Sequence, residues 1–128
     1  MHDATEGGVL GGLLEVALAS EVGMRIAQDA IPVRPEVRAV CDHVGIDPYT
    51  SISEGTLIAT VRSEFAMGYL QALAREGIDA AIVGDVTDPA EGRVLIDEDG
   101  GERALEHPGL DPFWGAFGAW ASDAAAGG

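Results

Sequence analysis

The chain contains no lysine, and 22 aspartate and glutamate residues outnumber its seven arginines, which gives a formal net charge of −15. So large an excess of negative charge repels phosphate backbones, so we do not expect binding to nucleic acid. The acidic residues are spread along the whole chain rather than collected in a tail. This distribution indicates that carboxylates keep the entire surface hydrated, as in salt-adapted proteins.

Cys41 is the single cysteine of the chain. One cysteine cannot form an internal disulfide or a cysteine metal cluster. Its place on the apolar stripe of an expected helix favours a buried structural thiol over a nucleophile. The three histidines, His2, His43 and His107, lack metal-ligand spacing, and no Gly-x-Ser-x-Gly elbow occurs. We therefore predict no metal site within this chain and assign no catalytic residue.

Long apolar runs are also missing. None is long enough to span a bilayer, and no basic segment followed by an apolar stretch marks a signal peptide. We therefore expect a cytoplasmic protein without membrane contact. The 128 residues, 47% of them hydrophobic, suffice for a domain with a real core.

The spacing of apolar residues predicts α-helices and β-strands in alternation. Leu10, Leu13 and Leu14 begin the stripe of a first helix, and Gly23 is its expected C-cap. The helices are expected at about 5–22, 35–44 and 63–76, and the strands at 24–27, 56–61, 78–86, 93–97 and 102–105. The inner faces of the second and third helices are expected to include Val37, Val40, Cys41 and Val44, and Ala66, Tyr69, Leu70, Leu73 and Ala74.

The order of these elements predicts an α+β fold, with a mixed β-sheet and helices packed mainly on one face. The strand at 56–61 is almost wholly apolar or β-branched, so we expect it at the centre of the sheet. The strand at 78–86 is expected to be buried around residues 80–83. The strand at 93–97 is expected to run antiparallel to 78–86, and the turn at 99–101 to form a hairpin with 102–105. No strand is expected before the first helix.

The end of the chain differs in composition, so we place a domain at 1–110 and a separate segment at 111–128. That segment holds four of the seven aromatic residues: Phe113, Trp114, Phe117 and Trp120. Asp111 and Pro112 can start a short helix there, and residues 124–128 are expected to be disordered. The aromatic rings either pack back on the sheet or form a dock for a partner domain.

The stretch from His2 to Gly12 is the strongest candidate for a site. A polar segment meets Gly7 and Gly8, and an apolar helix follows. Glycines leave the backbone N–H groups of a first helical turn uncovered, and the helix dipole adds positive potential, so the pattern fits an anion or phosphate site. An ordinary helix start, capped by Asp3 or Thr5 with Glu6 reaching back, fits the same residues.

Residues 2–9 resemble the Asp-x-Thr-x-Gly-Gly motif in the C-terminal domain of AIR synthetase-related proteins. That superfamily includes AIR synthetase, selenophosphate synthetase, thiamine-monophosphate kinase and the hydrogenase expression/formation protein HypE. The stretches at 47–49 and 53–59 look most like HypE, and 81–86, 92–94 and 100–101 are similar to its closing strands. The resemblance covers roughly residues 2–105.

This resemblance implies the C-terminal part of an ATP-dependent enzyme that transfers phosphate or dehydrates its substrate. Asp3, Thr5, Gly7 and Gly8 would bind the phosphates or nucleotide, while Ser53, Glu54 and Gly55 would border the substrate cleft. ATP and Mg²⁺ would be the cofactors. An N-terminal domain would carry the metal-binding aspartates and form a homodimer, which makes this chain a fragment, inactive alone, that lacks even the first strands of its domain.

Two departures from HypE stand out. Glu6 occupies a position where HypE commonly has arginine, and a basic residue there would help to bind an anion. HypE also ends in a cysteine that carries the carbamoyl group converted into cyanide, whereas this chain has no cysteine after Cys41. Cyanide-ligand synthesis is therefore not expected. The alternative to an enzyme part is a non-catalytic α+β module that binds a ligand or pairs through its aromatic segment.

The distribution of charge predicts that salt stabilises the fold. Raising potassium chloride from dilute buffer to molar concentration should raise the melting temperature by several degrees, because mobile ions screen repulsion between the carboxylates. Thermal unfolding followed by circular dichroism measures this, with an equimolar series of sucrose as the control for non-ionic effects. Equal melting temperatures in dilute and molar salt would contradict the salt-adaptation hypothesis.

Overall fold

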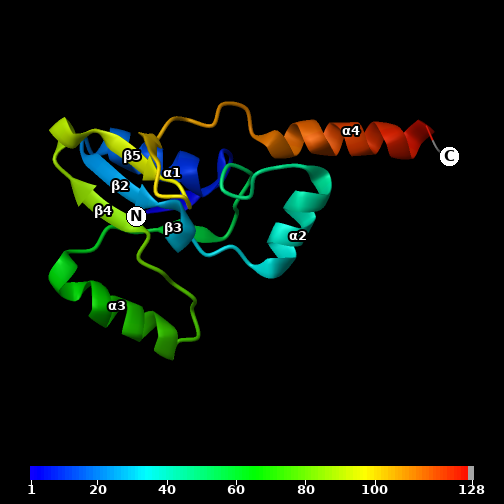
Figure 1. The fold of residues 1–128 in the computed structure, drawn as a ribbon. Coiled ribbons are helices and arrows are strands. Elements are labelled where there is room, and N and C mark those ends of the chain that lie inside the picture. Colours follow the sequence, from blue (N-terminus) through cyan, green and yellow to red (C-terminus); the bar gives the residue numbers. More distant parts are fainter. Residues whose placement is uncertain (127–128) are drawn as a thin grey trace. The chain divides into compact units, whose positions relative to one another are not determined.

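A computed structural model of the chain describes residues 1–126. Its strands are β1 (His2–Ala4), β2 (Gly23–Ala27), β3 (Thr56–Ile58), β4 (Gly84–Thr87), β5 (Arg93–Ile96) and β6 (Glu102–Ala104). Its helices are α1 (Gly8–Ala19), α2 (Pro35–Val44), α3 (Ser63–Arg75) and α4 (Pro112–Ala126), with short 3₁₀ turns at Gln28–Ala30 and Pro89–Glu91 (Figure 1). The chain forms two compact units, one made of residues 1, 17–32 and 59–105, the other of 2–16, 33–58 and 106 onwards.

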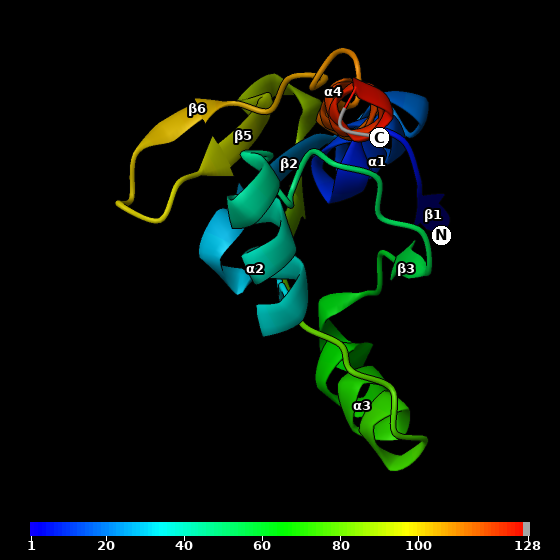
Figure 2. The same ribbon diagram turned by 90° about the vertical axis from the view of Figure 1, so that its right-hand side faces the viewer.

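The first unit is built on a four-stranded sheet in the order β4-β2-β5-β6. β2 runs parallel to β5 and antiparallel to β4, while β5 and β6 form an antiparallel hairpin (Figure 2). Ile26 lies opposite Leu95 in the register, and both are fully buried, as is Met24. The predicted α+β class with a mixed sheet and the hairpin at 99–101 are therefore confirmed.

β4 and β5 are not neighbours in the sheet. The strand at 93–97 was expected to run antiparallel to its predecessor, and β5 does run antiparallel to β4, with β2 between them. Glycine at position 84 permits this arrangement, because a Cβ there would lie 2.0 Å from the carbonyl oxygen of Arg25 on β2. A Cβ on Gly23 would likewise lie 2.2 Å from the carbonyl oxygen of Asp88, so close packing at the start of β2 requires glycine at this position. Gly23 is not the C-cap of α1, which ends at Ala19.

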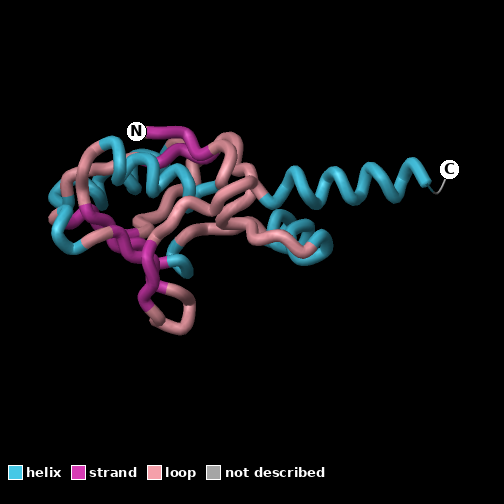
Figure 3. The backbone as a smooth tube through the Cα atoms, turned by 90° about the horizontal axis from the view of Figure 1, so that it is seen from above, coloured by secondary structure: helices cyan, strands magenta, loops and turns pink. Residues whose placement is uncertain are grey.

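The second unit contains a two-stranded antiparallel sheet of β1 and β3, in which His2 lies opposite Ile58 and Ala4 opposite Thr56. A strand therefore precedes the first helix, which the sequence argument did not expect. Apolar residues 56–58 pair with this strand instead of entering the main sheet, and residues 59–61 are not in a strand. Figure 3 shows how short the paired segments are beside the loops.

Helix boundaries agree with the sequence better than helix faces do. α2 starts at Pro35 and ends at Gly45, whose φ of 72° makes it the expected left-handed cap. Its predicted inner face is wrong, since Val37, Val40 and Val44 are exposed and only Cys41 is buried. Burial raises the pKa of the Cys41 thiol, which fits a structural residue.

The region around α3 departs furthest from expectation. α3 ends one residue before its predicted end, and none of its residues is buried, so its predicted inner face is only partly covered. The apolar stretch at 78–83 was expected to be a buried strand, yet it forms no strand, and Ile78 and Ile82 are half exposed. Strand structure is present only where residues 84–87 meet β2.

α4 is longer than the short helix expected. It runs to residue 126, while residues 127 and 128 of the tail expected to be disordered lie outside the described residues. The rings of Phe113, Trp114, Phe117 and Trp120 contact one another in sequence along the helix. Trp114, Phe117 and Trp120 are 45%, 49% and 65% exposed. Within residues 1–126 no helix has the length and apolar character that crossing a membrane requires.

The different burial of two leucines gives a stability prediction. Leu95→Ala should lower the free energy of unfolding by about 2–5 kcal/mol, because it opens a cavity at a fully buried site. Leu70→Ala, on the predicted inner face of α3, should cost under about 1 kcal/mol, because that side chain is only partly covered. Urea unfolding of both variants measures this, and a Leu70→Ala cost as large as that of Leu95→Ala would contradict the open face of α3.

Candidate anion site at the glycine-rich turn

The turn between β1 and α1 depends on two glycines. Gly7 and Gly8 have φ values of 78° and 65°, in the left-handed region that only glycine adopts at little cost. The N–H of Gly8 donates to the carbonyl oxygen of Thr5 at 3.2 Å, which closes the turn. α1 therefore begins at Gly8 rather than near Thr5, and Asp3 lies on the preceding strand, too early to act as its cap.

The loop at 47–51 packs directly on this turn. Asp47 organises the loop, because its side chain accepts the N–H of Tyr49 and its carbonyl oxygen accepts the N–H of Ser51. The carbonyl oxygen of Tyr49 then accepts the N–H of Leu10, in the first turn of α1, at 3.1 Å. A Cβ on Gly8 would lie 2.5 Å from that same oxygen, so glycine at position 8 is required by packing within the protein.

Tyr49 holds the loop in place. Its side chain is 4% exposed, and its hydroxyl accepts a hydrogen bond from Nη2 of Arg38 at 3.0 Å. The guanidinium of Arg38 also lies 5.4 Å from the centre of the Tyr49 ring, a cation–π distance. The carbonyl groups that receive α1 are thus supported by a buried aromatic residue.

The two predicted site segments meet at Thr5. Its carbonyl oxygen accepts the N–H of Ser53 at 3.2 Å as well as that of Gly8. Ser53 also shares a hydrogen bond with Thr56 between their hydroxyl groups, at 3.0 Å. Glu54 and Gly55 form the exposed turn that follows. Thr5, Gly7, Gly8 and Ser53 are therefore neighbours, whereas Asp3 is exposed on β1.

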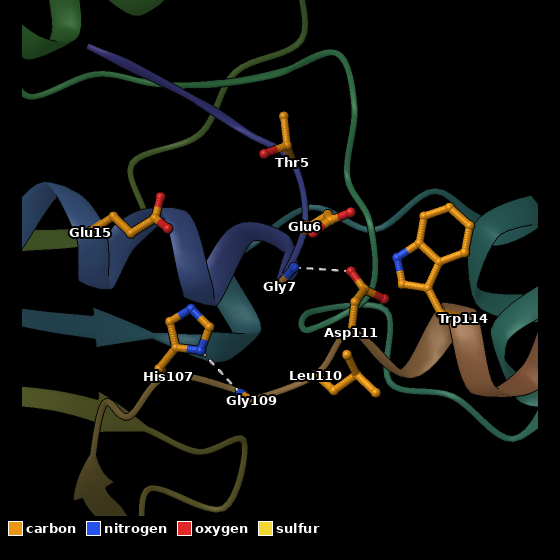
Figure 4. Close-up of a pocket in the computed structure, with 9 residues that line it drawn as sticks. All are labelled: Thr5, Glu6, Gly7, Glu15, His107, Gly109, Leu110, Asp111 and Trp114. Atoms are coloured by element: carbon orange, nitrogen blue, oxygen red, sulfur yellow. Dashed lines mark hydrogen bonds between the residues drawn. The ribbon is translucent and has the colours of Figure 1, made fainter.

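An open cavity of about 350 Å³ lies beside the turn (Figure 4). Its lining comes from the turn, from α1 and from the segment before and at the start of α4: Thr5, Glu6, Gly7, Glu15, His107, Gly109, Leu110, Asp111 and Trp114. All these residues belong to the second unit. Of the predicted site residues, only Thr5 and Gly7 line this cavity, while Ser53, Glu54 and Gly55 do not.

Asp111 changes the interpretation of the helix start. One of its carboxylate oxygens, Oδ2, accepts the N–H of Gly7 at 2.9 Å (Figure 4). The other, Oδ1, accepts the N–H of Phe113 at 2.9 Å. The side chain is only 4% exposed. The N–H of Gly7, expected to be uncovered, is therefore bonded to an anion of the chain itself, and that of Leu10 is bonded to Tyr49.

Sequence reasoning identified Asp111 only as a helix start. The Asp-Pro pair does signal an N-cap, and the Phe113 contact fulfils it. Its second partner is 104 residues away along the chain, and no local pattern reports such a contact.

The cavity is electrostatically negative. Glu6, Glu15 and Asp111 contribute carboxylates, whereas no arginine lines it. Nε2 of His2 lies 2.6 Å from a carboxylate oxygen of Glu15, and Nδ1 of His107 accepts the N–H of Gly109. Among residues 1–126, no group of three or more histidine, cysteine, aspartate or glutamate side chains is placed to hold a metal ion.

An ion pair joins two strands of the first unit, whereas the cavity belongs to the second unit. The guanidinium of Arg25 on β2 contacts the carboxylate of Glu102 on β6. This contact lowers the pKa of Glu102 and raises that of Arg25. The pair joins two strands of the sheet and has no place in the candidate site.

Comparison with known proteins identifies the class. Residues 1–97 match the family described as AIR synthase related protein, C-terminal domain, and the chain belongs to this family. The computed structure also superimposes on a crystal structure of hydrogenase maturation protein HypE in complex with ATP, with a TM-score of 0.75 and 32% identity over 86% of this chain and 36% of that one.

Curated relatives narrow the similarity to HypE. The chain is 43% identical over 88 residues to carbamoyl dehydratase HypE of Rhizobium leguminosarum bv. viciae. These aligned residues make up 67% of this chain and 25% of the relative. It is 36% identical over 115 residues to carbamoyl dehydratase HypE of Escherichia coli strain K12, which covers 88% of this chain and 34% of the relative. The chain thus spans a quarter to a third of these relatives.

Two glycines of α1 give a matched pair of variants. Gly8→Ala should lower the free energy of unfolding by about 2 kcal/mol or more, because it combines a left-handed φ with a clash against the 47–51 loop. Gly11→Ala should be neutral or stabilise by up to about 1 kcal/mol, because its Cβ has ordinary contacts and alanine favours helix. Urea unfolding compares them, and a harmless Gly8→Ala would refute the close packing on this loop.

Proposed function

We propose that the chain is the C-terminal part of an ATP-dependent enzyme of the AIR synthetase/HypE type, in which the glycine-rich turn borders the nucleotide cleft. The observation that carries this proposal is the double hydrogen bond at the carbonyl oxygen of Thr5. These bonds join the Gly7-Gly8 turn to Ser53 within one unit. The two segments that each resemble the family, 2–9 and 53–59, are therefore neighbours in space. The existence of a HypE structure with bound ATP supports the nature of the ligand.

In this proposal Asp3, Thr5, Gly7 and Gly8 face the phosphates, and Ser53, Glu54 and Gly55 border the substrate. Phosphoryl transfer needs oriented hydrogen-bond donors and cations more than it needs a nucleophile. Among the backbone N–H groups of the turn, that of Gly7 is the candidate donor, because those of Gly8 and Leu10 are bonded to carbonyl oxygens of the chain. The carboxylates of Glu6, Glu15 and Asp111 do not fit bare polyphosphate, so the site suits a nucleotide whose charge Mg²⁺ has reduced.

The remaining parts of such an enzyme lie outside this chain. No cluster of metal ligands occurs among residues 1–126, so we propose that an N-terminal domain provides them and forms the homodimer. The chain alone would then bind nucleotide weakly and catalyse nothing.

Nuclear magnetic resonance of the ¹⁵N-labelled chain tests the nucleotide site. Titration with Mg²⁺-ATP should shift the amide signals of Thr5, Gly7, Gly8 and Ser53. Glu6→Arg should tighten binding about two- to fivefold, because it replaces a repulsive charge beside the phosphates by an attractive one. Glu36→Arg makes the same charge change on α2 and should have little effect.

The outcome separates the two candidate functions. Shifts confined to other residues, or equal effects of Glu6→Arg and Glu36→Arg, would contradict a nucleotide site at this turn. The exposed rings of Trp114, Phe117 and Trp120 favour an interaction module as the second candidate. That alternative would stand if Mg²⁺-ATP produced no shifts at all.

A further inference from the structure

Residues 107–111, here called the strap, lie across the glycine-rich turn. A Cβ on Gly7 would be 3.2 Å from Cγ of Pro108 and 3.9 Å from Cε1 of His107. Pro108 also approaches Gly11, one helical turn further along α1. At the end of the strap, the carboxylate of Asp111 accepts the N–H of Gly7 (Figure 4). The strap therefore covers the part of the turn that a phosphate group would approach.

The carboxylate of Asp111 has the chemistry of the ligand that the turn is proposed to bind. A backbone N–H prefers a charged oxygen acceptor, whether it belongs to a carboxylate or to a phosphate. At 2.9 Å, Oδ2 of Asp111 occupies the position in front of the Gly7 N–H. A second anion cannot lie at that position while the carboxylate remains, since it would face both steric overlap and repulsion between like charges.

The strap is held at few points. It has no regular secondary structure, and Leu110 is 84% exposed. Within it, only Asp111 is buried and Pro108 partly so. Segments with little buried apolar surface open at low free energy, so release of the Asp111 contact is compatible with an intact fold. The Phe113 N–H keeps its own bond to Oδ1, which caps α4 separately.

We infer that Asp111 is a built-in competitor for the anion site, so that the strap and the phosphate group occupy the turn alternately. This inference rests on the proposed function, and it adds regulation to the same site. In the state described here the strap is seated. Binding of nucleotide then requires the strap to leave, which lowers the apparent affinity in proportion to the population of the open state.

Asp111→Asn tests the competition directly. Asparagine has one acceptor oxygen, so it can cap α4 through the Phe113 N–H, but it presents no charge to Gly7. The variant should bind Mg²⁺-ATP and inorganic phosphate about five- to tenfold more tightly than the unmodified chain. Asp99→Asn, an equal change of charge at an exposed hairpin position, should bind as the unmodified chain does.

Hydrogen exchange of the Gly7 amide gives a readout that does not depend on affinity. Exchange should be slow in the unmodified chain, faster in Asp111→Asn, and slow again when inorganic phosphate saturates that variant. Trp114 lines the same cavity, so its fluorescence in a Trp120→Phe background should change as the anion displaces the strap. Pro108→Ala, which weakens the seating of the strap without altering charge, should raise affinity by a smaller factor and carries the test if Asp111→Asn does not fold.

The possible failures are distinguishable. Equal affinities of Asp111→Asn, Pro108→Ala and the unmodified chain, with amide shifts still at Gly7 and Gly8, would overturn the competition and leave the nucleotide site in place. Absence of binding in every form would overturn both proposals. An increase in affinity shared by Asp99→Asn would reduce the effect to net charge and would also overturn the competition.

Discussion

The close approach of Gly8 to the carbonyl groups of the 47–51 loop is the contact on which the second unit depends. It requires a residue without Cβ, and it places the Leu10 N–H on the Tyr49 oxygen. The same turn directs the Thr5 carbonyl toward Ser53. A single backbone conformation thus satisfies helix donors that would otherwise lack partners and joins two distant segments.

The packing of Gly8 against the 47–51 loop shows that two glycines before a helix need not mark a ligand site. Glycines before a helix are usually taken to admit a ligand, yet Gly8 here admits the chain's own carbonyl groups. Gly7 differs, since its N–H points to a carboxylate that arrives from a remote segment. The N–H of Gly7 is bonded to a carboxylate, whereas that of Gly8 is bonded to a carbonyl oxygen. An anion site at this turn therefore depends on Gly7.

Local patterns predicted the ends of α2 and, within one residue, those of α3, as well as most strand positions, because capping residues act over a few residues. Pro35 and Gly45 fix α2 by backbone geometry alone. The faces of α2 and α3 could not be predicted in the same way, because burial depends on which surface is near, and apolar spacing does not report that. Ile78 to Val83 illustrates the limit: its composition favours a buried strand, but strand structure begins only at Gly84, where the chain pairs with β2.

The site shows the same division between local and distant information. Thr5, Gly7, Gly8 and Ser53 were accessible from sequence motifs, whereas the Asp111 contact spans 104 residues and has no local signature. In a chain with 22 acidic residues, a single carboxylate carries almost no information by itself. Burial distinguishes Asp111 from the other acidic residues at positions 1–122. A carboxylate withdrawn from water must be compensated by donors, and the N–H groups of Gly7 and Phe113 provide that compensation.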